Sequence, residues 1–75
     1  DFVDNLDIKI KSEKLKTYIN KYLTPREKLV ITLRYGLDGN DPLTQREIAK
    51  KLNISRSYVS RIERKALDTL RTQFM

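Results

Sequence analysis

The feature that most constrains the fold of this chain is the segment TQREIAKKLNISRSYVSRIERKALDTL, which extends from Thr44 to Leu70. Its apolar residues recur at steps of three and four on both sides of the short sequence Asn53-Ile54-Ser55, which predicts two amphipathic helices joined by a sharp turn. Asn53 tolerates the left-handed backbone that ends a helix, and Ser55 is a good N-cap for the next helix. This layout is typical of a helix-turn-helix unit, which we assign to residues 44–71.

The second helix of this unit separates its apolar residues from its basic ones. The apolar side is expected to pack inward and consists of Val59, Ile62, Ala66 and Leu70, with Leu67 at its edge. Guanidinium forks and serine hydroxyls on the other side suit base edges and phosphate oxygens in a DNA major groove. The candidate DNA-binding residues of this helix are Arg56, Ser57, Tyr58, Ser60, Arg61, Arg64 and Lys65. The alternatives are a solvated charged face without a ligand and, for Tyr58, a place in the core.

The net charge of +6 is concentrated in the second half of the chain. Residues 42–75 carry eight Lys and Arg against three acidic residues, whereas residues 1–41 carry eight against seven. This distribution places the footprint of a polyanionic partner on the helix-turn-helix half. Because the chain has no cysteine and no histidine, we expect no disulfide, no metal site and no cofactor, and we do not expect an enzyme.

Capping signals mark the starts of two helices. Thr44 and Glu47 have the spacing of a capping box, in which each side chain bonds the other residue's backbone N–H. Thr24 and Glu27 repeat that spacing, and Pro25 occupies the first helical position, where its missing N–H does no harm. One helix is therefore predicted to begin after residue 24 and another after residue 44.

Two helices are thus expected upstream of the helix-turn-helix unit. The first covers residues 12–22 and places on one face Leu15, Tyr18, Ile19 and Tyr22. The second follows Thr24, and its buried side is predicted to consist of Leu29, Val30, Leu33 and Leu37. Gly36 is suited to end it, and the turn-rich connector at 38–42 does not continue with the sixth-position glycine and the terminal glutamate that an EF-hand calcium loop requires.

The chain is long enough for one small domain. We expect an all-α, four-helix domain over residues 12–75, preceded by an irregular lead-in at residues 1–11, where Leu6, Ile8 and Ile10 alternate with charges. No apolar run approaches the length of a membrane span, and the start does not resemble a secretory signal. A cytoplasmic protein that does not bind membranes is expected.

Glu63 is the residue that local rules explain least. It lies beside the apolar stripe, and the positions three and four residues away offer it no cation. Two interpretations remain open at this point. Glu63 is either partly exposed at the edge of the stripe or paired with a basic residue of another helix, where the pair would fix the helix crossing.

The segment LTPREKLVITLRYGLDGNDPLTQREIAKKLNISRSYVSRIERKAL, residues 23–67, contains the motifs LTPRE, LRYGL, TQREIA and SRSYVSRIE. With these motifs in this order and spacing, it resembles region 4 of the sigma-70 family of bacterial RNA polymerase initiation factors. The resemblance is greatest to the sporulation factors of the late mother-cell type. It implies a winged-helix-like four-helix domain that recognises the minus-35 promoter element on double-stranded DNA and docks on the beta-flap of the RNA polymerase core.

The resemblance also implies roles for individual residues. Those implied to face bases or the adjoining backbone are Arg56, Ser57, Ser60 and Arg61, and those implied to contact phosphates are Arg46, Tyr58, Arg64 and Lys65. The housekeeping branch commonly has glutamate where Ser57 stands and glutamine where Arg61 stands, so a different promoter hexamer is expected. The implied polymerase-docking residues, near an apolar groove between the first two helices, are Leu15, Ile19, Leu23, Leu29 and Leu33. For each of these five, the alternative is simple core packing.

Two other functional classes remain. One is a stand-alone helix-turn-helix regulator, which usually dimerises to read paired half-sites, although no spare apolar helix for dimerisation is evident in the sequence. The other is a protein-interaction module that binds an anti-sigma factor or an activator through its basic face. We expect the isolated chain to be a monomer.

Overall fold

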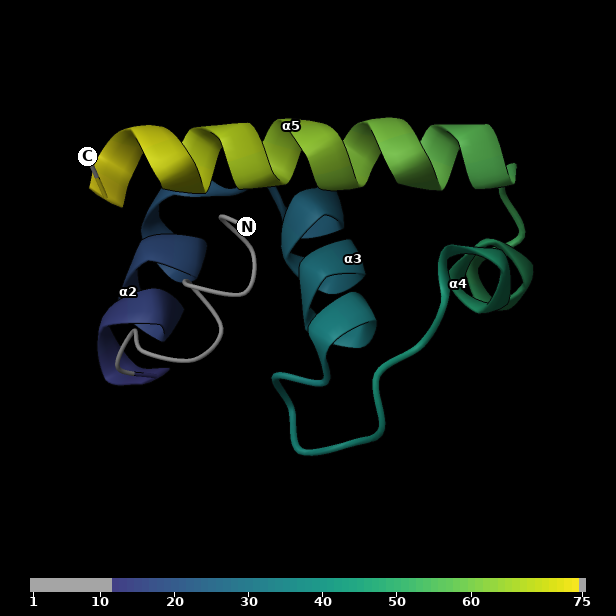
Figure 1. Ribbon diagram of the computed structural model, residues 1–75, viewed down its shortest axis with the longest axis horizontal. Helices are drawn as coiled ribbons and strands as arrows, with labels where there is room; N and C mark the ends of the chain where they lie inside the picture. Colours follow the sequence, from purple (N-terminus) through teal and green to yellow (C-terminus); the bar gives the residue numbers. More distant parts are fainter. Residues whose placement is uncertain (1–11, 75) are drawn as a thin grey trace.

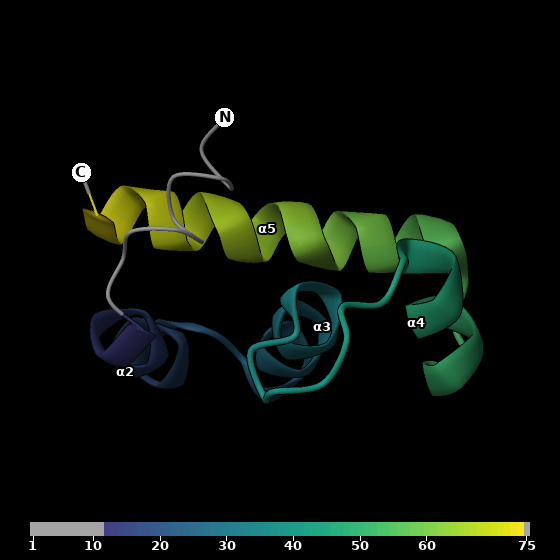
Figure 2. The same ribbon diagram turned by 60° about the horizontal axis from the view of Figure 1, so that its bottom comes forward.

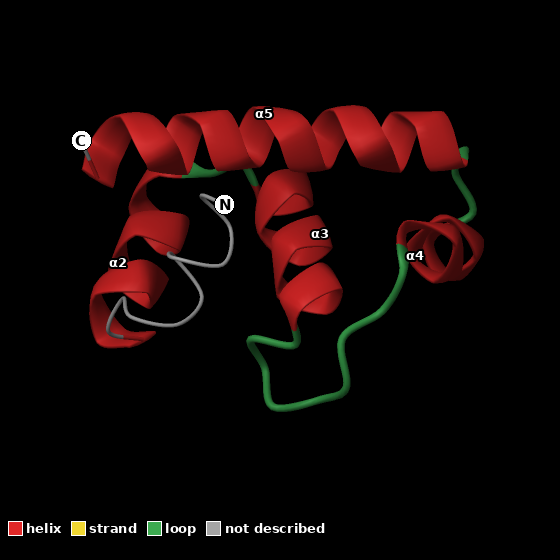
Figure 3. Ribbon diagram, in the orientation of Figure 1, coloured by secondary structure: helices red, strands yellow, loops and turns green. Residues whose placement is uncertain are grey.

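The computed structural model describes residues 12–74, which fold into four helices and, within that range, no strand (Figure 3). The helices are α2 (Ser12–Tyr22), α3 (Pro25–Tyr35), α4 (Gln45–Leu52) and α5 (Arg56–Phe74). Figures 1 and 2 show that the three shorter helices all pack against one side of the long helix α5. The expectation of an all-α, four-helix domain is confirmed. The expected lead-in at residues 1–11 lies outside the described residues.

Capping boxes begin α3 and α4, as predicted. The Thr24 Oγ1 accepts a 3.2 Å hydrogen bond from the backbone N–H of Glu27, and the Glu27 Oε1 accepts a 3.0 Å bond from the N–H of Thr24. Thr44 and Glu47 form the same reciprocal pair over 3.1 and 2.8 Å. Each box satisfies two backbone donors that a helix start otherwise leaves unpaired, so both helix entries are fixed locally.

Left-handed residues end these two helices. Gly36 follows α3 with φ 64° and ψ 35°, and Asn53 follows α4 with φ 59° and ψ 47°. Two residues later, the Ser55 Oγ accepts a 3.1 Å hydrogen bond from the backbone N–H of Tyr58 and caps α5. The turn from α4 to α5 is therefore short, because one residue stops the first helix and the next cap begins the second.

The hydrophobic core consists of two clusters on either side of α3. The first joins α2 and α3 to the C-terminal half of α5 and contains Leu15, Ile19, Leu23, Ile31, Ala66 and Leu70. The second joins α3 and α4 to the N-terminal half of α5 and contains Val30, Ile48, Ala49, Val59 and Ile62. All four residues of the predicted apolar stripe of α5 lie in these clusters, which confirms the predicted inward side of that helix.

The predicted buried side of α3 is partly wrong. Val30 is fully buried, and Leu33 and Leu37 are half-buried, but Leu29 is 42% exposed and Ile31, which the prediction omitted, is 2% exposed. The reason is tertiary: α3 lies between the two core clusters, and the adjacent residues Val30 and Ile31 pack into different ones. The inward arc of α3 is therefore centred on these two residues, and Leu29 falls outside it.

The connector between α3 and α4 is held by its own side chains. The backbone N–H of Asn40 donates a 3.1 Å hydrogen bond to Asp38 Oδ1, and the Asn40 Nδ2 donates a 3.0 Å bond to Oδ2. The backbone hydrogen bond from Asn40 is the main cause that lowers the pKa of Asp38 below its ordinary value. The connector then returns to the fold where the Leu43 N–H donates to the Leu33 carbonyl over 3.0 Å.

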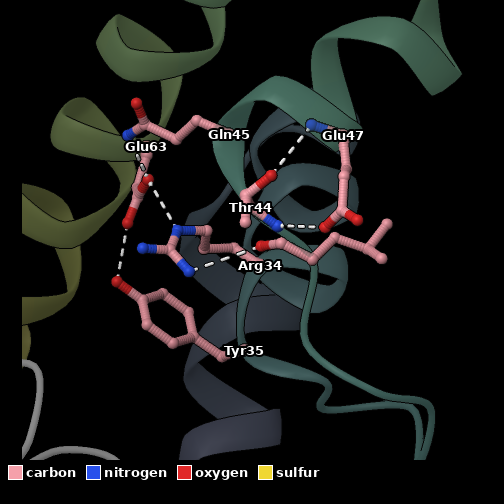
Figure 4. A network of polar contacts seen from close by, with 7 residues as sticks. Arg34, Tyr35, Thr44, Gln45, Glu47 and Glu63 are labelled. Carbon is pink, nitrogen blue, oxygen red and sulfur yellow. Dashed lines mark hydrogen bonds and ion pairs between the residues drawn. The ribbon is translucent and has the colours of Figure 1, made fainter.

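Glu63 is the polar centre of the fold (Figure 4). It is 7% exposed, and its carboxylate accepts a 2.6 Å hydrogen bond from the Tyr35 hydroxyl and a 2.7 Å bond from the Gln45 Nε2. The Arg34 Nε lies 3.4 Å from Glu63 Oε1, and another nitrogen of the same guanidinium donates to the Leu43 carbonyl over 3.3 Å. Of the two interpretations of Glu63, the pair with a cation on another helix is confirmed, and it ties α3, α4 and α5 together.

Candidate nucleic-acid interface

The first turns of α5 present the side chains that the sequence singled out. Ser57, Arg61 and Arg64 are exposed and Ser60 is half-buried, whereas Val59 and Ile62 on the opposite side are 0% and 7% exposed. Also exposed are the remaining candidates, which are Arg56, Tyr58 and Lys65 on α5 and Arg46 on α4. The structure therefore brings all eight candidates to the surface, seven of them on one helix, and their contacts with DNA stay a prediction.

The N-terminus of α5 differs from the other capped starts in its charge. The first turns of α3 and α4 each carry an acidic residue, Glu27 and Glu47, whereas the first turn of α5 carries none and begins with Arg56. Acidic side chains at a helix start offset the positive end of the helix dipole. Without one, the start of α5 keeps its full attraction for an anionic partner.

Three guanidinium groups border a shallow hollow between the starts of α4 and α5. The residues that line it are Arg34, Thr44, Gln45, Arg46 and Arg56. Arg34 was absent from the predicted site because its own motif, LRYGL, lies in another helix and only the folded chain brings it there. Its guanidinium is held on one side by Glu63 and the Leu43 carbonyl, yet its side chain remains 34% exposed. Such a fixed fork suits a phosphate.

A second hollow lies between the start of α3 and the outer side of α5. It is lined by Thr24, Arg26, Glu27, Tyr58, Arg61, Ile62 and Lys65. Tyr58 is 42% exposed and belongs to neither core cluster, so the interpretation of Tyr58 as a core residue is wrong. Arg26 was not among the predicted site residues either. Its position in the exposed first turn of a capped helix was the available signal.

The five predicted polymerase-docking residues do not form one surface. Leu15, Ile19 and Leu23 are 6%, 6% and 5% exposed in the first core cluster, and Leu33 packs half-buried against the second. Leu29 is the one exposed member of the set. A groove between α2 and α3 does exist, and it is lined by Lys16, Ile19, Asn20, Lys28, Thr32, Leu37 and Asp38. Ile19 is the only predicted docking residue that lines it, and the docking role itself stays a prediction.

Neither a metal site nor a membrane-spanning helix is found among the described residues. Residues 12–74 hold no group of three acidic, histidine or cysteine side chains placed to bind a metal ion. Each of the four described helices is too short or too polar to span a bilayer. What this part of the chain offers a ligand is a basic surface with hydroxyl groups, built around the start of α5.

Known proteins match this chain over most of its length. The profile of the family described as Sigma-70, region 4 matches residues 21–72. The chain is 55% identical over 67 residues to the RNA polymerase sigma-K factor of Bacillus subtilis. The aligned residues are 89% of this chain and 22% of that protein. It is 49% identical over 75 residues to the RNA polymerase sigma-28 factor of Bacillus thuringiensis subsp. kurstaki. The aligned residues are 100% of this chain and 31% of that protein.

A third relative is the RNA polymerase sigma-E factor of Clostridium acetobutylicum, which is 41% identical over 61 residues, or 81% of this chain and 26% of that protein. No solved structure shows a match to this chain. The chain spans less than a third of the length of these three relatives. Since the family profile covers more than half of the chain, the chain belongs to the family of sigma-70 region 4 domains.

Proposed function

We propose that this domain recognises the minus-35 element of promoter DNA as part of a bacterial RNA polymerase sigma factor, and so directs transcription initiation. The observation that carries the proposal is the sorting of side chains along α5. Its hydrophobic side is buried against α3 and α4, and its opposite side exposes Ser57, Arg61 and Arg64 next to an N-terminus without acidic residues. The family and the sigma factors that it resembles support the same function.

In this proposal the first half of α5 lies in the major groove, which is wide enough for one helix. The residues that face base edges or the adjoining DNA backbone are Arg56, Ser57, Ser60 and Arg61. A guanidinium can donate two hydrogen bonds to guanine, and a serine hydroxyl can donate or accept. Because Ser57 carries no charge and Arg61 carries a full positive charge, we expect a preference for sequences that offer acceptors at the position of Arg61.

Phosphate contacts fix the helix in the groove in this proposal. The residues assigned to them from the sequence are Arg46, Tyr58, Arg64 and Lys65, and the two hollows beside α5 add Arg26 and Arg34. These residues come from three helices and flank the reading side of α5, as backbone contacts on either side of a major groove must. Such contacts supply affinity and register, whereas the sequence preference comes from the bases.

The proposed protein partner is the RNA polymerase core, through its beta-flap. The groove between α2 and α3 supports this assignment, because Ile19 and Leu37 give it apolar walls and Lys16 and Lys28 border it. The exposed Leu29 on α3 adds an apolar side chain elsewhere on that helix. In this proposal the domain acts in the cytoplasm, without enzymatic activity of its own, and is a monomer when isolated.

A paired binding experiment separates this function from its alternatives. The immobilised chain is offered a purified polymerase flap segment and, separately, a duplex library with a randomised central segment, from which bound DNA is sequenced. Binding of the flap together with selection of one non-palindromic hexamer supports the proposal. Selection of a palindrome by a dimer would identify a stand-alone regulator. Failure to bind either, with binding to an acidic anti-sigma factor or activator, would identify an interaction module.

Two variants serve as controls for each other in that experiment. Asn20→Trp fills the groove between α2 and α3 with a bulky ring, because Asn20 is exposed and lines the groove. Arg61→Ala removes one guanidinium from the reading side of α5 and leaves that groove intact. The expected result is loss of flap binding in the first variant alone and loss of preference at one base pair in the second alone.

A further inference from the structure

Tyr58 and Arg61 form a cation–π pair on the surface of α5. The Arg61 guanidinium carbon lies 5.9 Å from the centre of the Tyr58 ring, within the range over which a cation is attracted to an aromatic face. Their spacing of three residues places the two side chains next to each other on one side of a helix. Both residues line the hollow between α5 and the start of α3, so the pair lies at the edge of the reading side.

The pair restrains Arg61 without using its hydrogen-bond donors. Among residues 12–74, Arg61 forms no hydrogen bond and no ion pair. Attraction to a ring acts on the charge of the guanidinium, so all its N–H groups remain available for a ligand. Arg34 is the contrasting case, because its guanidinium is already engaged by Glu63 and the Leu43 carbonyl. Arg61 is thus held in place while its N–H groups have no acceptor among the described residues. They can therefore donate hydrogen bonds to a ligand.

The backbone position of the residue that holds Arg61 is fixed by a helix cap. Tyr58 lies in the first turn of α5, where its backbone N–H donates to the Ser55 Oγ over 3.1 Å. Although Tyr58 is 42% exposed and belongs to neither core cluster, it lines the hollow beside the start of α3. The other arginines at the start of α5, Arg56 and Arg64, have no such contact with a ring among the described residues. Among the three arginines of the first half of α5, Arg61 is therefore the one that a ring contact restrains before a ligand binds.

We propose that Tyr58 is a positioning residue that directs the Arg61 guanidinium toward one base pair and thereby sharpens sequence choice at that position. This inference rests on the proposed function, because it takes α5 as the reading helix. A long arginine side chain loses much rotamer freedom when it binds, and a ring that restricts it beforehand reduces that loss. An exposed pair of this kind corresponds to about a two- to fivefold change in an equilibrium constant.

Four variants of the chain test the proposal: Tyr58→Phe, Tyr58→Leu, Arg61→Ala and the double variant Tyr58→Leu/Arg61→Ala. Each is equilibrated at low salt with the randomised duplex library, and base preference is determined by sequencing. The position at which Arg61→Ala abolishes the preference is the Arg61 position. We expect Tyr58→Leu to reduce the preference there about two- to fivefold and to leave the other positions unchanged. Tyr58→Phe should keep it, because the ring remains.

The hydroxyl of Tyr58 is tested by the same variants. If it contacts a phosphate, Tyr58→Phe weakens binding to every sequence equally and leaves the base preferences as they are. In the Arg61→Ala background, replacement of Tyr58 by leucine should change no preference further. An equal loss of preference in the phenylalanine and leucine variants, no loss in either, or a loss that persists without Arg61 would each overturn the positioning role.

A measurement on the free chain separates this inference from the proposed function. The order parameter of the Arg61 Nε–Hε bond, from ¹⁵N relaxation, should exceed that of Arg64 in the native chain. It should fall in Tyr58→Leu and be retained in Tyr58→Phe. Equal order parameters for Arg61 and Arg64 overturn the positioning role even if α5 reads DNA. If the restraint is present and the native chain shows no base preference, the proposed function fails instead, and with it the role in sequence choice.

Discussion

The Tyr35 hydroxyl at the end of α3 donates a 2.6 Å hydrogen bond to the Glu63 carboxylate in the middle of α5. The same carboxylate binds Gln45 in the first turn of α4 and lies beside the Arg34 guanidinium (Figure 4). One buried acidic residue therefore connects the helix proposed to read DNA to both helices that support its N-terminal half. We expect this contact, together with apolar packing, to fix the angle between α4 and α5.

Replacing Glu63 by Ala is expected to destabilise the domain by about 1–3 kcal/mol, because it removes the carboxylate that accepts part-buried hydrogen bonds from Tyr35 and Gln45 and pairs with the Arg34 guanidinium. Urea unfolding followed by circular dichroism measures the change. The control is Asp68→Ala, which removes an exposed ion pair with Arg71 on the same helix and should change stability by less than about 1 kcal/mol. Equal effects of the two substitutions would contradict a special role for Glu63.

The two glycines around the connector provide a matched test of backbone strain. A Cβ at Gly36 would overlap the Asn40 carbonyl oxygen, whereas a Cβ at Gly39 would meet no atom within 4 Å, although both residues have positive φ. Gly39→Ala should therefore lower the free energy of unfolding only by the cost of placing alanine in a left-handed conformation, about 1–2 kcal/mol. Gly36→Ala should lower the free energy of unfolding further, because the backbone at Asn40 must also move. Thermal unfolding should show the larger fall in Tm for Gly36→Ala, and the reverse order would be inconsistent with this geometry.

Thr44 is expected to stabilise the domain through its hydroxyl. Thr44→Ala removes the acceptor of the Glu47 backbone N–H at the start of α4 and should cost roughly 0.5–2 kcal/mol. Thr44→Ser keeps the hydroxyl and should retain most of the stability. Chemical denaturation of the three proteins measures the difference, and a serine variant as unstable as the alanine variant would rule out the cap as the cause.

Lys65 is proposed to contact a phosphate, so Lys65→Ala should weaken binding to every duplex by a similar factor. Release of one fewer counterion should reduce the slope of log K against log salt concentration by about one unit. Fluorescence anisotropy at several salt concentrations measures that slope. Lys21→Ala, on α2, removes the same charge from an exposed residue outside the proposed interface and should leave the slope nearly unchanged. An unaltered slope in Lys65→Ala would exclude the phosphate contact.

The parts of this fold that sequence reasoning predicted correctly are those with local causes. The capping boxes of Thr24 and Thr44 are signals contained within four residues, and the left-handed Asn53 and the cap Ser55 define the turn between α4 and α5. The inward stripe of α5 was predicted because nearly all its apolar residues face one way. In each case neighbours in the sequence determine the structure.

The parts that were missed depend on contacts between distant segments. Leu29 was placed in the core and Ile31 was not, because periodicity alone does not reveal that α3 has a core cluster on each of two sides. A cationic partner for Glu63 was foreseen as one of two possibilities, but Tyr35 and Gln45 were not, since they lie 28 and 18 residues away in the sequence. Arg34 joins the basic surface for the same reason, whereas the position of Arg26 in the first turn of a capped helix was a local signal.

The proposed function requires that the exposed side of α5 reads bases. The most direct test compares the native chain with Arg61→Ala on the preferred duplex and on duplexes changed at one base pair at a time. We expect Arg61→Ala to lose about 1–3 kcal/mol of binding free energy on the preferred duplex, with relaxed choice at a single base pair and unchanged preferences elsewhere. An equal loss of affinity on every duplex, with all base preferences intact, would contradict base reading by this side of α5.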